Sequence, residues 1–327
     1  MTINRLRQTA LGVVLVAVLV GATSLASSAQ APAPSPDAVA QARAFIAKDD
    51  FVEAEKVVRS LIATKGATPE ALEGLSWLGR GNLAKNRVDE ALRFAYETER
   101  LSQEALKARE MDAEPRLPIA IGAAYEVQSQ VLAKQGDTAG AVVLLQKSID
   151  AYRTTSILAR LQKNLNMLTL EGRLAPAYVN TEFVGAKPPA LSDLRGKVTL
   201  LFFWAHWCPD CKRMAADLRE LQAAYRDQGF VIVGPTQRYG YVAKRAPAEP
   251  AVEMAYIGQV LEEFYKGIDM SIPVSADSFA NYGSSTTPTI VLVDRQGIVT
   301  LYHPGQMTRA ELEPYVQKAI RIGSAAK

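Results

Sequence analysis

The spacing of apolar residues along the chain changes once, at residues 169–176. From Asp37 to about Leu170, apolar residues recur three and four positions apart, which predicts helices almost throughout this stretch. Beyond it, short apolar runs rich in Val, Ile and Phe are bounded by Gly and Pro, which predicts strands and connecting helices. The pattern therefore predicts an all-α domain over residues 37–170 and an α/β domain over residues 171–327.

Three short signatures recur in the helical stretch: Asp50–Ala54, Arg87–Ala91 and Asp137–Ala141. Each is expected to open the second helix of a helical hairpin, where the alanine allows close helix approach. The pattern resembles degenerate tetratricopeptide repeats, with Leu78 and Gly79 at that family's Leu-Gly position. The alanines stand 37 and 50 residues apart, against a family period of about 34, so an irregular helical bundle stays an open alternative. The large aromatic residues at helical spacings are expected in the core: Trp77, Tyr96, Tyr125 and Tyr152.

In the α/β part, an apolar run beginning at Val198 predicts a buried strand that leads directly into a helix from Asp210 to about Gln228. Four more apolar runs predict strands: Phe230–Gly234, Ile272–Ser275, Thr289–Val293 and Ile298–Tyr302. A closing helix is predicted at Arg309–Ile322. This order of elements predicts an α/β sandwich around a mixed sheet.

Two cysteines, Cys208 and Cys211, follow the first of these strands at the predicted start of a helix. Unpaired N–H groups and the positive end of the helix dipole favour a thiolate there, so Cys208 is expected to titrate below about 8.5. Cys208 is then the exposed attacking sulfur and Cys211 the resolving one, within disulfide reach of each other. A zinc site is disfavoured, because it needs about four ligands and the only histidines are His206 and His303.

Three motifs occur in order along the chain: Leu191–Lys197, Phe203–Cys211, and Thr287–Asp294 followed by Gly297. With these motifs, residues 173–325 resemble the thioredoxin superfamily, most closely its periplasmic TlpA-like branch. The resemblance implies a thioredoxin-like fold, protein-disulfide oxidoreductase activity without a cofactor or metal, and disulfide-bearing client proteins. It also implies a cis bond before Pro288, with the backbone of Thr287 aligning the client beside the cysteines. Trp207 and Pro209 are expected to contact the client too.

Charged neighbours of Cys208 act in opposite directions. Lys212 and Arg213 would lower its pKa, whereas the carboxylate of Asp210 would oppose ionisation of a nearby thiol. His206 is expected to be an ordinary surface histidine. Phe202 stands where ordinary thioredoxin has a buried aspartate that helps to deprotonate the resolving cysteine, so the proton acceptor for Cys211 is left unnamed.

Peroxide reduction is disfavoured because Ala205 and Leu201 stand where a neighbouring family, the peroxiredoxins, needs Thr or Ser and Pro. The loop at residues 237–249 is longer than its connection needs and leaves a strand at the edge where Cys208 sits. Two interpretations stay open for it: a solvated insertion, or a loop that shapes substrate access. The second would involve these side chains: Tyr239, Tyr241, Lys244 and Arg245.

Residues 1–29 have the pattern of a secretory signal peptide. Arg5 and Arg7 precede a short apolar core, and small residues lead to cleavage after Ala29. An uncleaved anchor is the alternative, and the Pro/Ala/Ser-rich residues 30–36 predict a tether. The formal charge of +3 falls to +1 without the two leader arginines, and nothing in it indicates a nucleic-acid partner.

Together these observations predict an exported, periplasmic thiol-disulfide oxidoreductase that reduces client proteins. Reduction in an oxidising compartment requires electrons from elsewhere, which implies a membrane electron donor. The helical domain shows no catalytic residues and is expected to bind a protein partner. The alternative is an interaction scaffold, in which the helical domain assembles a complex and the thioredoxin-like domain is mainly a docking module.

Overall fold

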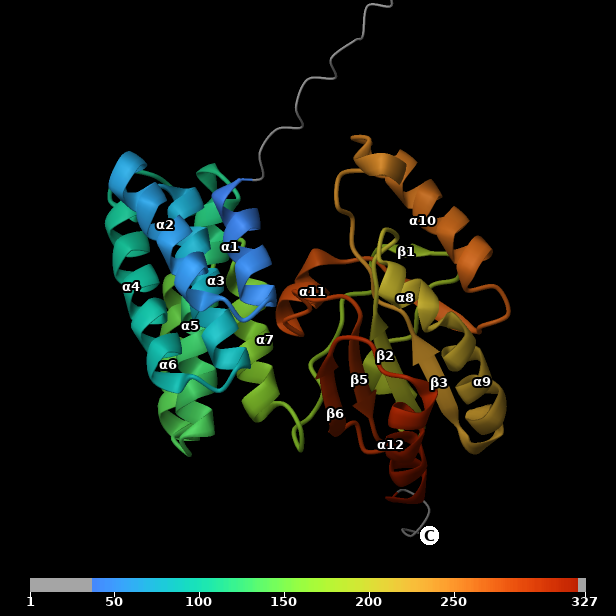
Figure 1. Ribbon diagram of the computed structural model, residues 1–327. Coiled ribbons are helices and arrows are strands. Elements are labelled where there is room, and N and C mark those ends of the chain that lie inside the picture. Colours follow the sequence, from blue (N-terminus) through green and yellow to red (C-terminus); the bar gives the residue numbers. More distant parts are fainter. Residues whose placement is uncertain (1–36, 323–327) are drawn as a thin grey trace, which may run out of the picture. The chain divides into compact units, whose positions relative to one another are not determined.

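The computed structural model describes residues 37–322, which fall within one compact unit (Figure 1). The predicted signal peptide at residues 1–29 and the tether at 30–36 lie outside the described residues. Within residues 37–322, no helix combines the length and the apolar composition required to cross a membrane.

The first part of the described chain is helical. Its elements are α1 (Ala38–Ala47), α2 (Phe51–Lys65), α3 (Pro69–Ala84), α4 (Val88–Leu106), the 3-10 turn η1 (Met111–Ala113), α5 (Arg116–Lys134), α6 (Thr138–Ala151) and α7 (Leu158–Thr169). α1 packs on α2, α3 on α4, and α5 on α6, so successive helices form hairpins (Figure 1).

Local capping explains where the second helix of a hairpin begins. Asp50 and Asp137 each accept a hydrogen bond from a backbone N–H three residues later, at the starts of α2 and α6. The alanines of the three signatures, Ala54, Ala91 and Ala141, are fully buried. The expectation for Tyr96 is wrong: its side chain is 54% exposed on α4, because that helix turns its polar face outward there.

The second part is a sheet covered by helices. The described residues form six strands in the order β1-β4-β3-β2-β5-β6. The strands are β1 (Phe183–Val184), β2 (Val198–Phe203), β3 (Phe230–Val233), β4 (Met270–Pro273), β5 (Thr289–Val293) and β6 (Val299–Pro304). β3 runs parallel to β2 and β4, and the other pairings are antiparallel, so the predicted α/β sandwich with a mixed sheet is confirmed.

The helical elements of this part are η2 (Leu191–Leu194), α8 (Pro209–Arg213), α9 (Ala215–Tyr225), η3 (Arg226–Gln228), η4 (Ala243–Arg245), α10 (Pro250–Phe264), α11 (Ala276–Asn281) and α12 (Arg309–Ile322). The predicted helix from Asp210 is therefore broken at Met214 into α8 and α9. β5 and α12 have the predicted bounds, whereas β4 begins two residues earlier than predicted. The sequence pattern did not locate α10.

The sheet is buried on both faces because the side chains of β2 alternate between two hydrophobic clusters. Leu200 and Phe202 pack with residues of α9 and α12, whereas Leu201 and Phe203 pack with Phe279 of α11. All six residues of β2 are buried. β2 is therefore held rigidly between two layers, and the turn that follows it starts from a fixed point.

Candidate functional site

The two cysteines lie at the first turn of α8, directly beyond β2. Cys208 is the N-cap residue, Pro209 is the first helical residue, and the backbone N–H of Cys211 lies 3.1 Å from the Cys208 sulfur. The two sulfurs are joined in a disulfide, with 5.3 Å between the Cα atoms. The structure thus brings both cysteines together at the end of a buried strand.

The loop that precedes β5, the strand next to β2, lies against the disulfide. β5 pairs antiparallel with β2, with Phe203 opposite Thr289, so the residues before β5 lie beside the residues after β2. The peptide bond between Thr287 and Pro288 is cis, and the Thr287 carbonyl oxygen lies 3.5 Å from the Cys208 sulfur. Cys208 is only 1% exposed in this disulfide form, so the expectation of an exposed sulfur is wrong here.

Trp207 is the exposed member of the active-site turn. Its side chain is 43% exposed, although the cysteine that follows it is buried. Its ring stands edge-on to Tyr239 of the loop at 237–249, with 5.4 Å between the ring centroids. The end of β3, three residues before this loop, is held by the Trp204 indole N–H, which donates to the Gly234 carbonyl at 3.0 Å. Trp207 and this loop therefore form one continuous surface beside the disulfide.

The charged residues of α8 are already paired or stacked. Asp210 forms an ion pair with Arg213, one turn along the helix, so these opposite charges largely offset each other near the cysteines. The ammonium of Lys212 lies 4.2 Å from the centre of the Phe264 ring. Of the three residues expected to tune Cys208, Lys212 is the one that forms no ion pair with a carboxylate among residues 37–322.

His206 is a buried residue, and its expected place on the surface is wrong. It is 1% exposed, and its Nε2 lies 3.0 Å from a carboxylate oxygen of Glu253, on α10. Three tyrosine rings surround it edge-on with centroids 5.3 to 5.5 Å away, at Tyr239, Tyr241 and Tyr256. Two of these rings come from the loop at 237–249 and one from α10, so distant segments bury the histidine.

Glu253 is the residue that sequence reasoning missed. Its side chain is 1% exposed. Its carboxylate accepts hydrogen bonds from the backbone N–H groups of Tyr239 and Gly240, at 2.5 and 2.8 Å, in addition to its contact with His206. One carboxylate thereby joins α10, the loop at 237–249 and the active-site turn. Pro250 at the first position of α10 signalled a helix start, but nothing in the local sequence shows that this glutamate points inward.

Comparison with known proteins agrees with this geometry. Residues 191–320 match the family model described as a thioredoxin-like domain. These residues form a thioredoxin-like domain. The predicted resemblance is therefore confirmed for this part of the chain. The cysteine pair, the cis-proline loop and the buried β2 all belong to the domain.

Two curated relatives have about the same similarity. Thiol-disulfide oxidoreductase ResA of Bacillus cereus is 29% identical over 151 residues, which are 45% of this chain and 77% of that protein. Thioredoxin-like protein YneN of Bacillus subtilis is 28% identical over 146 residues, covering 44% and 76%. A solved structure, a putative thiol:disulfide interchange protein DsbE from Chlorobium tepidum, is 26% identical, covers 46% of this chain and 97% of its own, and has a TM-score of 0.37. The relatives support thioredoxin-type oxidoreductase activity for the domain.

Phe202 is fully buried in the thioredoxin-like domain and leaves no carboxylate at its position in β2. Its ring and that of Trp204 pack against Tyr265, with centroids 6.2 and 5.0 Å away. Burial raises the pKa of Tyr265, so this phenol stays neutral. The surroundings of this position are therefore apolar and aromatic, and the pair of ionisable side chains buried beside the active-site turn is His206 with Glu253.

Burial lowers the pKa of His206 below its ordinary 6.5, and the hydrogen bond to Glu253 offsets this only in part. The unfolded chain then takes up a proton before the folded chain, so the free energy of unfolding falls as the pH drops below about 6.5. One such proton gives a slope of at most about 1.4 kcal/mol per pH unit. Urea unfolding of wild type and His206→Gln between pH 7.5 and 5 measures this slope of the free energy of unfolding against pH. The variant is expected to lose this part of the pH dependence, and an unchanged dependence would contradict the assignment.

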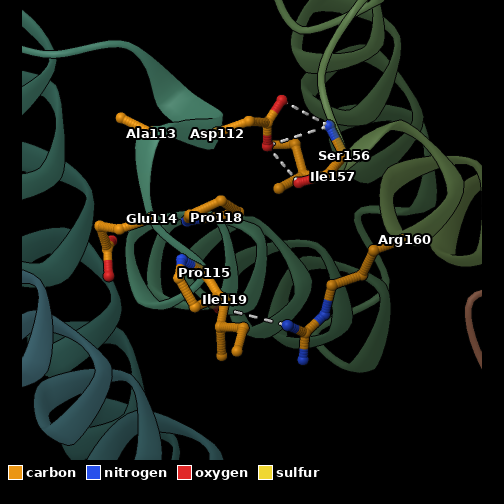
Figure 2. A pocket seen from close by; sticks show the side chains of 9 residues that line it. All are labelled: Asp112, Ala113, Glu114, Pro115, Pro118, Ile119, Ser156, Ile157 and Arg160. Atoms are coloured by element: carbon orange, nitrogen blue, oxygen red, sulfur yellow. Dashed lines mark hydrogen bonds between the residues drawn. The ribbon is translucent and has the colours of Figure 1, made fainter. Parts of the chain in front are cut away.

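The helical part has a separate cavity of about 610 Å³ (Figure 2). Its wall is mainly apolar, from Pro115, Pro118, Ile119 and Ile157. Asp112 accepts hydrogen bonds from Ser156, and Arg160 donates to the backbone carbonyl of Ile119 at 3.2 Å. These bonds join residues of the rim to one another, so the cavity is a defined feature of the helical part.

Proposed function

We propose that this protein is an exported thiol-disulfide oxidoreductase that reduces disulfide bonds of client proteins. The observation that carries the proposal is the Cys208–Cys211 disulfide at the start of α8, with the Thr287 carbonyl 3.5 Å from the Cys208 sulfur. A nucleophilic sulfur and a free backbone edge are what disulfide exchange with a peptide needs.

The reaction proceeds from the dithiol form. The Cys208 thiolate attacks one sulfur of a client disulfide, forming a mixed disulfide and releasing the other client sulfur as a thiolate. The Cys211 thiolate then attacks the Cys208 sulfur and releases the second client thiolate. The client gains two electrons and, with two protons, becomes a dithiol, while the domain becomes the disulfide form seen in the structure.

We propose roles for the residues next to the two cysteines. Thr287 and Pro288 hold the client backbone beside the sulfurs, and Trp207 gives it an exposed apolar surface. The N-capping position of Cys208 directs backbone N–H groups at its sulfur, which stabilises a thiolate as attacker and as leaving group. Pro209 starts the helix that holds this geometry.

The oxidised domain must be reduced again before the next turnover. A membrane electron donor that delivers two electrons to the Cys208–Cys211 disulfide completes the cycle in the periplasm. The leader pattern at residues 1–29 supports export, and the arrangement we propose is a tether at 30–36, a helical domain at 37–170 and the thioredoxin-like domain at 171–327. The helical hairpins are proposed to bind a protein partner.

A second candidate function is a scaffold that assembles a complex through the helical part. The apolar cavity of about 610 Å³ favours it, because a fixed apolar cavity fits a partner side chain better than solvent. The two functions differ in their need for the cysteines. Undiminished cellular function of Cys208→Ser would favour the scaffold, and its loss would favour the enzyme.

The direction of electron flow is tested by the reduction potential of the Cys208–Cys211 pair. Equilibration with glutathione or dithiothreitol buffers, followed by thiol alkylation and mass measurement, gives this potential. A client reductase is expected near the thioredoxin value of about −270 mV. A potential near about −120 mV, at the oxidising end of the range, would mean that the protein introduces disulfides instead.

A further inference from the structure

A second cavity, of about 330 Å³, lies beside the exposed Trp207 and carries three cations. Lys212 comes from α8, and Lys244 and Arg245 come from η4 in the loop at 237–249. Tyr241 and Tyr256 supply aromatic walls. The cavity thus combines positive charge with flat apolar surface at the edge of the disulfide site.

None of these three cations has a carboxylate within 4.0 Å among residues 37–322, although many other lysines and arginines of the chain do. The nearby carboxylates are engaged elsewhere: Asp210 pairs with Arg213, and Glu253 with His206. Lys212 and Arg245 instead lie over aromatic rings, of Phe264 and Tyr241. In the part of the chain that the structure describes, no ion pair therefore neutralises the positive charge of the cavity.

The loop holds two of the cations in a costly conformation. Lys244 and Arg245 both have left-handed backbone angles, with φ of 56° and 59°. Such backbone angles are uncommon for residues other than glycine and persist only where the surroundings impose them. Here backbone hydrogen bonds close the loop, from Val242 N–H to Ala246 at 2.9 Å and from Ala248 N–H to Gly240 at 3.0 Å, and Glu253 anchors its start. The backbone that carries these two adjacent cations is thus fixed, and both side chains are exposed.

His206 gives the cavity a polar group of its own. It lines the cavity, it is 99% buried, and its Nδ1 has no hydrogen-bond partner among the described residues 37–322, while Nε2 faces Glu253. A buried nitrogen without a partner is unusual in a folded protein and costs free energy unless a ligand or water satisfies it. With the Nε2 proton shared with the Glu253 carboxylate, Nδ1 is an acceptor, so it suits a hydrogen-bond donor of a client, such as a backbone N–H, and not the client's carboxylate.

We propose that this cavity is the subsite for a carboxylate side chain of the client, close in sequence to the cysteine that Cys208 attacks. The proposal rests on the proposed function and names its substrate class: disulfide-bearing peptides with an Asp or Glu beside the cysteine. The carboxylate binds among Lys212, Lys244 and Arg245, and the apolar part of the client lies on Trp207. Recognition of charge next to the reacting sulfur gives a small active-site surface a way to choose among disulfides.

Binding is tested first without any electron transfer. Three peptides of one sequence, with serine in place of both cysteines and Glu, Gln or Lys at the flanking position, are titrated into the full-length protein by calorimetry. The Glu peptide is expected to bind about 5- to 10-fold more tightly than the Gln peptide at low salt, and the Lys peptide more weakly than both. At 0.5 M salt this preference is expected to shrink to about 2-fold.

Two double variants with the same change in charge separate the subsite from general charge effects. Lys244→Gln with Arg245→Gln is expected to bring the Glu-to-Gln ratio to about 1–2. The matched control, Lys318→Gln with Arg321→Gln on exposed positions of α12, is expected to keep the wild-type ratio. Reversal with Lys244→Glu and Arg245→Glu is expected to favour the Lys peptide.

Equal binding of the three peptides by wild type, or loss of the preference in the α12 control as well, would overturn the subsite. The disulfide forms of the same peptides then show whether the preference appears in kcat/KM for reduction. Wild type that reduces none of them, while still preferring the Glu peptide in calorimetry, would overturn the proposed reductase function and leave the subsite standing.

Discussion

Cys208→Ser is expected to lower the rate of client disulfide reduction by about 10³-fold or more. A serine hydroxyl stays protonated at neutral pH and forms no stable bond to a client sulfur, so neither the attack nor the mixed disulfide remains. Cys211 is not expected to take over the attack, because Cys208 is the N-cap residue of α8 and its sulfur is the one that a backbone N–H stabilises. The assay is reduction of insulin by the protein in excess dithiothreitol, corrected for the reaction without protein.

A matched control is a second serine substitution outside the active-site turn. Ala248→Ser lies at a partly buried loop position and carries no part of the proposed chemistry. It is expected to reduce insulin at the wild-type rate. Turnover by Cys208→Ser within about 10-fold of wild type would rule out Cys208 as the attacking sulfur.

Glu253→Ala is expected to lower the free energy of unfolding by about 3–5 kcal/mol. The change removes a buried carboxylate and leaves His206 and the backbone N–H groups of Tyr239 and Gly240 without their acceptor. Urea unfolding of the oxidised protein, followed by tryptophan fluorescence, measures the loss. The loop at 237–249 is expected to become the first segment to exchange its amide hydrogens.

Glu263→Ala on the same helix is the control for this substitution. Its side chain is exposed, so the expected change is within about 0.5 kcal/mol. Glu253→Gln keeps one acceptor oxygen and is expected to lie between the two alanine variants. A loss below about 1 kcal/mol for Glu253→Ala would show that the carboxylate does not hold the loop.

The chemistry of the site was predictable from the sequence because its signals are local. A buried strand, a cysteine at the helix start and a second cysteine three residues later lie within one short stretch, and β5 follows directly after Pro288. The bounds of β5 were right for a similar reason. A run of Thr289 and four apolar residues flanked by Pro288 and Asp294 leaves little room for other bounds of a short buried strand.

The surroundings of the site could not be predicted because they depend on tertiary contacts. His206 looks like a surface residue when only its neighbours in sequence are considered, and what buries it is a glutamate 47 positions away. α10 carries that glutamate, and the sequence pattern did not locate this helix. Asp210 and Arg213 looked like opposing influences on Cys208, and only the structure shows that they pair with each other.

The central claim is that the Cys208 sulfur attacks a client disulfide and that Cys211 releases the product. Cys211→Ala is the most direct test, because it keeps the attacker and removes the resolving sulfur. The reduced variant is mixed with a peptide that carries one disulfide, quenched with acid, and digested for mass spectrometry. A peptide joined to Cys208 at close to one equivalent is the predicted result, with none in Cys208→Ala. No adduct on Cys208, with the peptide disulfide left intact, would contradict the account.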